Sequence, residues 1–308
     1  MFRSKKIIIT GGAGFIGSNL ARALCYENEV VVVDNLCTGE IENIIDIMDN
    51  VIFIQEDISN LEALRGAFEG GDYVLHQAAL PSVQRSVEDP ITSNRNNVEG
   101  TLNVLVAARD CGVRRVVSAS SSSVYGDSPT LPKVETFQPD PRSPYAVTKL
   151  AGEFYCKVFY DIYGLETISL RYFNVFGPGQ SPKSQYAAVI PKFVEAIRTG
   201  ERPEIYGDGE QSRDFIYVEN VVIANVLACE VPRASGESIN IGSGEPVTLN
   251  RLIDDLKEIL KSEIEPIYSE PRLGDVRHSL ADISLAKELL GYKPRYSFRE
   301  GLEKMLLD

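Results

Sequence analysis

The chain has 308 residues, of which 44% are hydrophobic and 24% are charged, a composition typical of a globular protein. This length is enough for one large or two modest domains with a sizeable core. The formal net charge of −13 argues against general binding to nucleic acid or to an anionic membrane surface, so we expect neither as a partner. No apolar run reaches membrane-spanning length, and the first residues lead into a strand rather than a signal peptide.

Cysteine and histidine usage limits the compartment and the metal chemistry. The five cysteines are scattered, odd in number, and form no C-x-x-C pair, which favours reduced thiols in a cytoplasmic protein. The two histidines, His76 and His278, cannot form a multi-histidine site. We therefore expect no metal.

The first element expected along the chain is a buried parallel strand, because residues 7–9 are all isoleucine. It ends in a glycine-rich turn that opens onto a helical pattern. The spacing Gly12-x-Gly14-x-x-Gly17 matches the dinucleotide-binding fingerprint, in which glycines permit a tight turn and a close approach to a pyrophosphate. Glycine turns also occur for purely steric reasons, but here the strand and helix on either side are those of a nucleotide site.

A second β-branched run, residues 30–33, ends in Asp34, where an acid binds the ribose hydroxyls of the adenosine. Asn35 and Leu36 follow it, and no arginine stands there to receive a 2′-phosphate. We therefore expect NAD rather than NADP.

Strands and helices alternate through the first half of the chain. Strands are expected at 51–54, 73–76, 116–120 and 168–172, and long helices at 89–111 and 144–163. This alternation predicts a Rossmann-type, doubly wound parallel sheet of the α/β class. Asp57 follows the third strand, where it is expected to reach the adenine, and the small residues after the fourth strand leave space for a cofactor.

After residue 173 the elements become shorter and are separated by glycine-rich loops. A helix at 218–229 is expected to return to the first domain. We assign 1–173 plus 214–233 to an NAD-binding domain, and 174–213 plus 234–308 to a smaller C-terminal α/β substrate lobe. The second part contains expected helices at 250–261 and 283–290 and a short strand near residue 267.

The expected helix 144–163 carries apolar residues on more than one face. Either it is deeply buried, or the sheet covers one face and a partner subunit covers the other. We favour a homodimer formed through the helices near 89–111 and 144–163.

Tyr145 and Lys149 are four residues apart and therefore lie on the same face of this helix. A tyrosine is a poor base at neutral pH, but a nearby ammonium group and a nicotinamide cation both favour the phenolate. The pair can then act as a base toward a substrate hydroxyl, with a serine from the end of the fifth strand handing on the proton. The spacing alone is common, and a serine-rich turn beside a surface Tyr–Lys pair would give the same pattern.

Several motifs together carry a family resemblance. They are Gly11–Gly17, Asp34, Asn97, the Ser-Ser-x-x-Val-Tyr-Gly stretch that ends at Gly126, the Tyr145/Lys149 pair, and the run from Arg171 to Pro178. In this combination the chain resembles the extended short-chain dehydrogenase/reductase family. Over essentially its full length it is similar to the nucleotide-sugar 4-epimerases of that family.

The resemblance implies roles for individual residues. Ser121 would be the catalytic hydroxyl, Tyr145 the base, and Lys149 the group that holds the nicotinamide ribose. The cofactor site would comprise Gly11, Gly14, Phe15, Ile16, Gly17, Asp34, Asn35, Asp57, Ile58, Gln77, Ala78, Ala79, Asn97, Tyr145, Lys149 and Tyr172. The UDP-sugar site would comprise Ser82, Ser121, Ser122, Ser123, Asn174, Gln180, Val189, Tyr206, Arg213, Arg272, Asp275 and Ser279.

The choice of reaction is narrowed because no acidic residue stands directly after Ser121. Related dehydratases and decarboxylases place an acid close to the catalytic hydroxyl, whereas Ser122 and Ser123 follow it in this chain. The resemblance then implies oxidation at C4 of the sugar, rotation of the 4-keto sugar, and return of the hydride to its other face. Within such a cycle NAD is reused without leaving.

The choice of substrate is narrowed by the small side chain at position 279. Ser279 stands where UDP-galactose-restricted epimerases have a bulky tyrosine, so a 2-acetamido group is expected to fit. The resemblance is greatest to epimerases that act on UDP-N-acetylglucosamine or its uronic acid. A UDP-glucose/UDP-galactose 4-epimerase is the alternative, and a decarboxylase or dehydratase is less favoured. Ala188 replaces a usual asparagine, and Arg85 serves either a substrate carboxylate or the surface.

Overall fold

The computed structural model describes residues 2–181, 188–271 and 276–307. Its larger lobe is built on a seven-stranded sheet in the order β10-β6-β5-β4-β1-β2-β3, in which every neighbouring pair is parallel. The strands are β1 (Lys6–Thr10), β2 (Glu29–Val33), β3 (Val51–Ile54), β4 (Tyr73–His76), β5 (Arg115–Ser121), β6 (Glu166–Tyr172) and β10 (Ser238–Ile241). The predicted Rossmann-type parallel sheet is confirmed.

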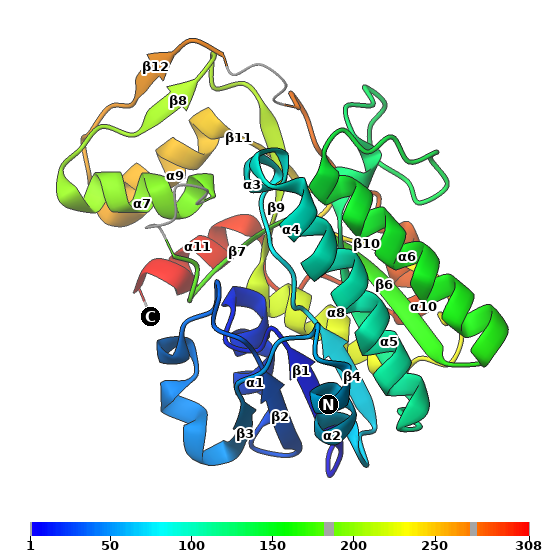
Figure 1. Cartoon of the computed structure of the whole chain (residues 1–308). Helices are drawn as coiled ribbons and strands as arrows, with labels where there is room; N and C mark the ends of the chain where they lie inside the picture. The colour runs from blue at the N-terminus through cyan, green and yellow to red at the C-terminus, as the bar shows by residue number, and fades with distance from the viewer. Residues whose placement is uncertain (1, 182–187, 272–275, 308) are drawn as a thin grey trace.

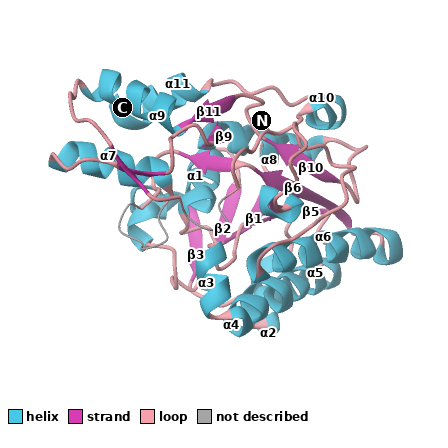
Figure 2. Ribbon diagram, turned by 90° about the horizontal axis from the view of Figure 1, so that it is seen from above, coloured by secondary structure: helices cyan, strands magenta, loops and turns pink. Residues whose placement is uncertain are grey.

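Helices cover both faces of this sheet, because successive strand residues point to opposite sides and both sides are apolar. Ile7 and Ile9 of β1 belong to a core packed against α1 (Phe15–Leu24), α8 (Val218–Glu230) and α10 (Ser284–Leu290). Ile8 faces the second core, formed with α2 (Leu61–Phe68), α5 (Gly100–Asp110) and α6 (Pro144–Tyr163). Figure 2 shows the sheet between these two helical layers.

The segment before α5 is less regular than the single helix expected over 89–111. It comprises α3 (Val83–Glu88), α4 (Pro90–Asn94) and a π-helical stretch (Arg95–Glu99) that continues into α5. Short 3-10 turns lie at Ile41–Asn43, Ile45–Asn50 and Ser122–Tyr125. No helix within the described ranges is long and apolar enough to cross a membrane.

The smaller lobe lies at the upper left of Figure 1. It contains a three-stranded sheet of β11 (Pro246–Thr248), β9 (Ser212–Tyr217) and β7 (Asn174–Phe176), and a two-stranded sheet of β12 (Ile267–Ser269) and β8 (Glu204–Tyr206). Its helices are α7 (Val189–Thr199), α9 (Leu249–Leu260) and α11 (Phe298–Leu307), and they share one apolar core with these strands.

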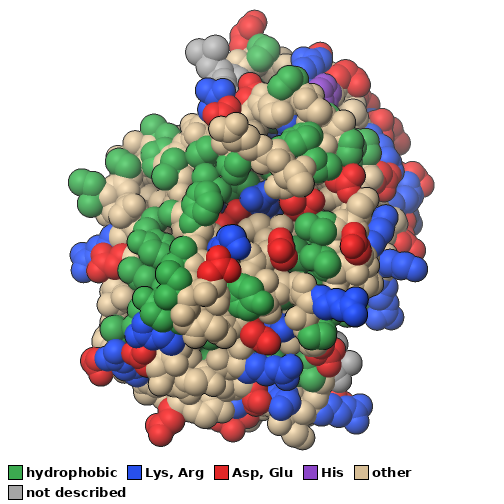
Figure 3. Space-filling view, turned by 90° about the vertical axis from the view of Figure 1, so that its right-hand side faces the viewer, with side chains coloured by type: hydrophobic (Ala, Val, Ile, Leu, Met, Phe, Trp, Pro, Cys, Tyr) green, Lys and Arg blue, Asp and Glu red, His purple; other side chains and the backbone are tan. Residues whose placement is uncertain are grey.

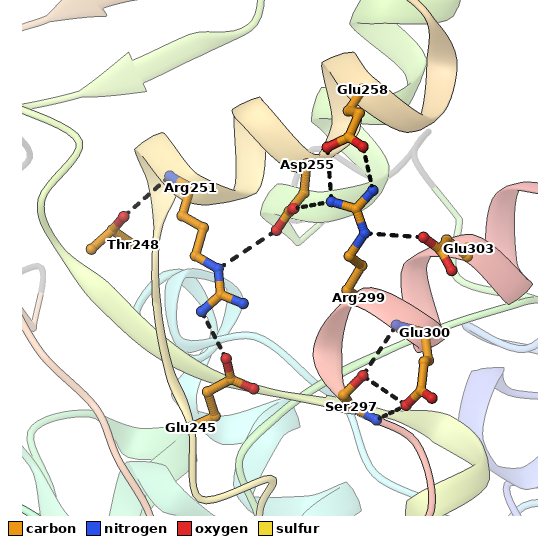
Figure 4. Close-up of polar contacts among 9 residues, drawn as sticks. All are labelled: Glu245, Thr248, Arg251, Asp255, Glu258, Ser297, Arg299, Glu300 and Glu303. Carbon is orange, nitrogen blue, oxygen red and sulfur yellow. Dashed lines mark hydrogen bonds and ion pairs between the residues drawn. The ribbon is translucent and has the colours of Figure 1, made fainter.

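Ion pairs connect α9 and α11 at the surface of this lobe. The Arg299 guanidinium on α11 contacts the carboxylates of Asp255 and Glu258 on α9 (Figure 4). Arg251 on α9 bonds to Glu245 before β11 at 2.7 Å. Because the partners of the buried Asp255 are partly or largely exposed, we assign most of the lobe's stability to its apolar core.

The lobes differ from the predicted division in two respects. The division places residues 234–308 in the substrate lobe, yet β10 pairs with β6 in the central sheet and α10 packs against that sheet. The reason is burial: Ile239 and Ile241 complete the apolar edge of the large sheet, and Leu290 covers it. Residues 214–217, which it places in the NAD-binding part, lie in β9 of the smaller lobe.

Candidate active site

The turn between β1 and α1 brings two backbones into close contact. Gly11 has φ +71°, and a Cβ placed on it would lie 2.6 Å from the amide nitrogen of Ala78, which follows β4. At Gly17 a Cβ would lie 2.1 Å from the Gly11 carbonyl oxygen. The side-chain-free surface at these two positions lets α1 begin directly above the strand, with its first N–H groups toward the carboxyl edge of the sheet.

A cavity of about 910 Å³ occupies that edge. It runs from the glycine turn, past Asp34, to Tyr145 and Lys149. The predicted cofactor residues that line it are Gly11, Gly14, Phe15, Ile16, Gly17, Asp34, Asn35, Ile58, Gln77, Ala78, Ala79, Tyr145, Lys149 and Tyr172. Its position, outside the carboxyl ends of parallel strands, is where doubly wound sheets bind ligands.

At the adenosine end, Asp34 is fixed by backbone donors. Its carboxylate accepts N–H bonds from Ala13 at 3.0 Å and from Leu36 at 2.8 Å. Burial raises the pKa of Asp34, although these bonds oppose the rise by favouring the carboxylate. The carboxylate is thus oriented on the cavity wall, and its contact with a ribose stays a prediction.

Two predicted cofactor residues do not line the cavity. Asp57 accepts bonds from Ser59 N–H at 2.7 Å and from the Asn35 side chain at 2.6 Å, which fix the loop after β3. Asn97 is buried and bonds to both backbone groups of Leu80 and to the Thr148 hydroxyl. Its amide therefore ties the loop after β4 to α6 and acts on the site through the backbone.

Two of the three predicted catalytic residues, Tyr145 and Lys149, line the other end of the cavity, and Ser121 bonds to Tyr145 without lining it. Burial raises the pKa of Tyr145, and a hydrogen bond with Ser121 opposes that rise. The Lys149 ammonium donates to the Ala119 carbonyl at 2.8 Å and lies 5.9 Å from the centre of the Tyr145 ring. Burial lowers the pKa of Lys149 to about 8. The phenol, hydroxyl and ammonium groups are thus placed for proton transfer, while their catalytic roles stay predictions.

The cavity between these ends offers polar groups that a bound cofactor would satisfy. The Gln77 side chain donates to Tyr172 OH at 3.3 Å, while its own Oε1 is buried without a hydrogen-bond partner among the described residues. Asn225 on α8 donates to the same Tyr172 oxygen at 2.8 Å. Buried unpaired acceptors are rare in folded proteins, so a donor from a ligand is expected here. The residues present therefore fit a dinucleotide.

A second cavity, of about 490 Å³, lies in the smaller lobe. Five predicted UDP-sugar residues line it, namely Asn174, Gln180, Val189, Tyr206 and Arg213. Gln180, Ala188 and Lys192 line both cavities, so the two lie next to each other and share part of a wall. The Gln180 Oε1 is a further buried acceptor without a partner among the described residues.

Three of the remaining predicted substrate residues are serines near the first cavity. Ser82 lines that cavity and caps α3, where its Oγ accepts the Arg85 N–H at 3.3 Å. Ser122 and Ser123 form the 3-10 turn after Ser121, and the buried Ser123 Oγ has no partner among the described residues.

Ser279 lies farther from the cavity walls. It lines neither cavity among the described residues, and its N–H donates to the Ser212 carbonyl at 3.0 Å. Arg272 and Asp275 lie outside the described residues.

Some residues at the site were not predicted. Asn225 bonds to Tyr172 and Gln77 from the middle of α8, and an amide within the apolar run 221–229 was the available signal. Ser120 and Lys192 also line the first cavity. Ser120 is the first residue of the Ser-Ser-x-x-Val-Tyr-Gly stretch, whereas Lys192 stands in no pattern that singles it out in the sequence. Within the described ranges, no three His, Cys, Asp or Glu side chains cluster so as to hold a metal ion.

Comparisons with known proteins agree with this geometry. The sequence profile of the NAD dependent epimerase/dehydratase family matches residues 7–242. A UDP-N-acetylglucosamine 4-epimerase from Methanobrevibacter ruminantium, solved in complex with UDP-N-acetylmuramic acid, is 43% identical with a TM-score of 0.95, covering 99% of this chain and 97% of that one. A UDP-glucose 4-epimerase from Thermotoga maritima, solved with UDP-glucose, is 40% identical with a TM-score of 0.92 and 97% of each chain covered. The UDP-glucose 4-epimerase of Mycolicibacterium smegmatis is 38% identical over 305 residues, covering 97% of this chain and 96% of that protein. This chain belongs to the NAD dependent epimerase/dehydratase family.

Proposed function

We propose that the protein is an NAD-dependent UDP-sugar 4-epimerase that interconverts UDP-N-acetylglucosamine and UDP-N-acetylgalactosamine. The observation that carries this proposal is that Lys149 and the Ser121-bonded Tyr145 line the end of a cavity that begins at the glycine turn, and that a second cavity shares part of its wall. NAD bound in the first cavity would accept hydride from C4 of the sugar and return it to the opposite face.

Residues of the chain then transfer the proton of the sugar 4-hydroxyl. The Tyr145 phenolate takes the proton of the sugar 4-hydroxyl, with the Ser121 hydroxyl as hydrogen-bond partner between them. The positive charge of Lys149 stabilises that phenolate. When the 4-keto sugar is reduced from its other face, Tyr145 returns the proton to the oxygen.

Epimerisation is favoured over elimination of water or loss of carbon dioxide because no acid follows Ser121. The next residues, Ser122 and Ser123, offer hydroxyl groups from a short 3-10 turn. A hydroxyl can orient a sugar oxygen but cannot serve as the general acid that a dehydratase needs at neutral pH.

For the sugar, we propose that Ser279 leaves space for a 2-acetamido group where a tyrosine would fill it. A sugar that carries a carboxylate is the second candidate, because Arg85 and Lys192 both line the first cavity. Arginine suits a carboxylate through its paired donors. The two basic residues therefore make a UDP-hexuronic acid the second candidate substrate.

The test is turnover without added cofactor. Purified protein incubated with UDP-N-acetylglucosamine should yield UDP-N-acetylgalactosamine, while Tyr145→Phe should lose about 10²–10⁴-fold in kcat and keep its bound NAD. Ser279→Tyr should remove activity on acetylated sugars selectively. Turnover of UDP-glucose alone would contradict the assignment of substrate, and full activity of Tyr145→Phe would contradict the mechanism.

We further propose that the protein is a cytoplasmic homodimer. The support lies on α6, where Val147, Phe154, Val158 and Ile162 form an exposed apolar stripe, and Phe154 is 60% exposed. Val87 on α3 and Ile91 on α4 extend it. Figure 3 looks onto this side and shows hydrophobic side chains gathered there. Such a patch is typical of a protein interface, and a second copy would cover it through the same face.

A further inference from the structure

Glu153 lies one helical turn after Lys149 on α6 and is buried in a polar cluster that the proposed mechanism does not use. Its Oε1 accepts the Ser120 hydroxyl at 2.5 Å and Arg171 Nε at 2.8 Å. Its Oε2 accepts Arg171 Nη2 at 2.7 Å. The Glu153 and Arg171 side chains are each 5% exposed. This bidentate ion pair is therefore buried beside the candidate active site.

Arg171 continues the cluster away from the cavity. Its Nη1 donates to Tyr125 OH at 2.8 Å, and that hydroxyl donates to Asn240 Oδ1 on β10 at 2.7 Å. Burial lowers the pKa of Arg171, but the hydrogen bonds and charges of Glu153 and Tyr125 together outweigh it, so the net pKa is raised. Arg171 is thus held charged, and its position is fixed by the groups that it contacts on α6 and near β5.

The cluster also fixes the end of β5, the strand that delivers Ser121. Two successive residues of β5 are tied to α6 one turn apart: the Ala119 carbonyl accepts from Lys149, and the Ser120 hydroxyl donates to Glu153. Ser121 is the next residue. Tyr145 lies in the first turn of α6. The position of Ser121 opposite Tyr145 therefore depends on the register between β5 and α6 that these two bonds set.

Glu153 also acts on Lys149 through charge. The titratable groups that influence Lys149 include Tyr145, Cys156 and Glu153 on α6 itself, and His76 on β4. Burial raises the pKa of Cys156 to about 11 and lowers that of His76 to about 3, so both are neutral near pH 7. Glu153 is then the anion of this group, with Arg171 on β6 as its own counter-ion.

We propose that Glu153 is a positioning residue of the epimerisation site. It holds the end of β5 against α6 through Ser120, and its carboxylate, one helical turn from Lys149, favours the ammonium form that stabilises the Tyr145 phenolate. This inference rests on the proposed function for its kinetic consequences and on geometry for its effect on Lys149.

The test compares Glu153→Gln with the wild type and with Asp161→Asn. Asp161 is the other acid on α6; it is exposed and pairs with Lys157 at the surface. In Glu153→Gln the alkaline limb of the kcat profile should move to lower pH, since the Glu153 charge raises the pKa of Lys149. The KM should change little, and Glu153→Asp should restore part of kcat. Asp161→Asn should behave as wild type.

A second readout does not depend on turnover. The ionisation of Lys149 is followed by ¹³C NMR in lysine-labelled protein, with Lys149→Arg identifying the signal. Its titration midpoint should fall in Glu153→Gln. Because that variant leaves Arg171 unpaired and can fail to fold, Glu153→Gln/Arg171→Gln provides a neutral pair in which a smaller shift of the same sign is expected.

The outcomes separate the two proposals. If the titration midpoint of Lys149 and the pH profile of kcat are both unchanged in the folded variants, the proposed role of Glu153 is overturned. If the variants lose only stability, Glu153 is purely structural. A wild type that epimerises no UDP-sugar would refute the proposed function, and the NMR titration would still decide whether Glu153 controls the charge of Lys149.

Discussion

Replacing Gly17 with alanine tests whether the glycine turn is shaped by close backbone contact. The added Cβ would lie 2.1 Å from the Gly11 carbonyl oxygen and 2.7 Å from the Gly12 Cα. The first separation is 1.3 Å shorter than the 3.4 Å at which ordinary contact begins. The neighbouring atoms are backbone rather than flexible side chain, so the start of α1 must move away from β1.

The cost follows from this forced movement. Overpacking of a rigid site typically costs about 1–3 kcal/mol, so the free energy of unfolding should fall by at least that amount. The melting temperature should fall by about 2–12 °C, since 1 kcal/mol corresponds to roughly 2–4 °C in large domains. Displacing α1 also moves its first N–H groups, and we expect NAD to bind at least about tenfold more weakly.

The matched control is Gly66→Ala in α2. Gly66 is exposed, and a Cβ there would meet nothing within 4 Å. Alanine is the better helix former, so this variant should be more stable by about 0.5–1 kcal/mol. Thermal unfolding and NAD titration of both variants provide the measurements. A Gly17→Ala protein with wild-type stability and wild-type NAD affinity would refute the steric account of the turn.

Three further predictions concern pH, assembly and cofactor content. Burial lowers the pKa of His76 to about 3. Below about pH 6.5 the unfolded chain therefore binds a proton at this histidine that the folded chain does not bind. Denaturant titrations should show that the free energy of unfolding falls by about 2 kcal/mol between about pH 7 and pH 5. His76→Gln should remove that slope, and the exposed His278→Gln should keep it. Phe154→Glu should convert a dimer to a monomer in light scattering, whereas Ile45→Glu, an equally exposed apolar site elsewhere, should not. Protein purified without added NAD should release close to one nicotinamide nucleotide per chain on denaturation; largely empty protein would contradict a resident cofactor.

Local signals were strong enough to predict most elements of the fold. Helix α6 begins at Pro144 and ends at Tyr163, as predicted, because Ser143 caps its first turn and Gly164 adopts a left-handed conformation after its last. Most of the parallel strands could be recognised because they are short runs rich in β-branched residues and bounded by turn residues.

Long-range arrangement was less accessible from the sequence. Strand β10 has only four residues, and its partner β6 ends 66 positions earlier in the chain, so no local pattern assigns it to the central sheet. The same reason hid Asn225 and Glu153, whose partners lie on other elements. By contrast, Tyr145 and Lys149 could be found together because one helix carries both.

An overall charge of −13 is compatible with a site for an anionic dinucleotide because the attraction is supplied locally. The cavity wall at the start of α1 is formed by Gly14, Phe15, Ile16 and Gly17, and the first turn of that helix contains no acidic residue. Its N–H groups and the positive end of the helix dipole act within a few ångströms of a bound phosphate. Most acidic side chains lie on the surface, where salt screens them beyond about 8 Å. Backbone donors in a glycine turn therefore allow anion binding without a basic patch, which is why the charge of the whole chain argues against nucleic acid yet does not exclude NAD.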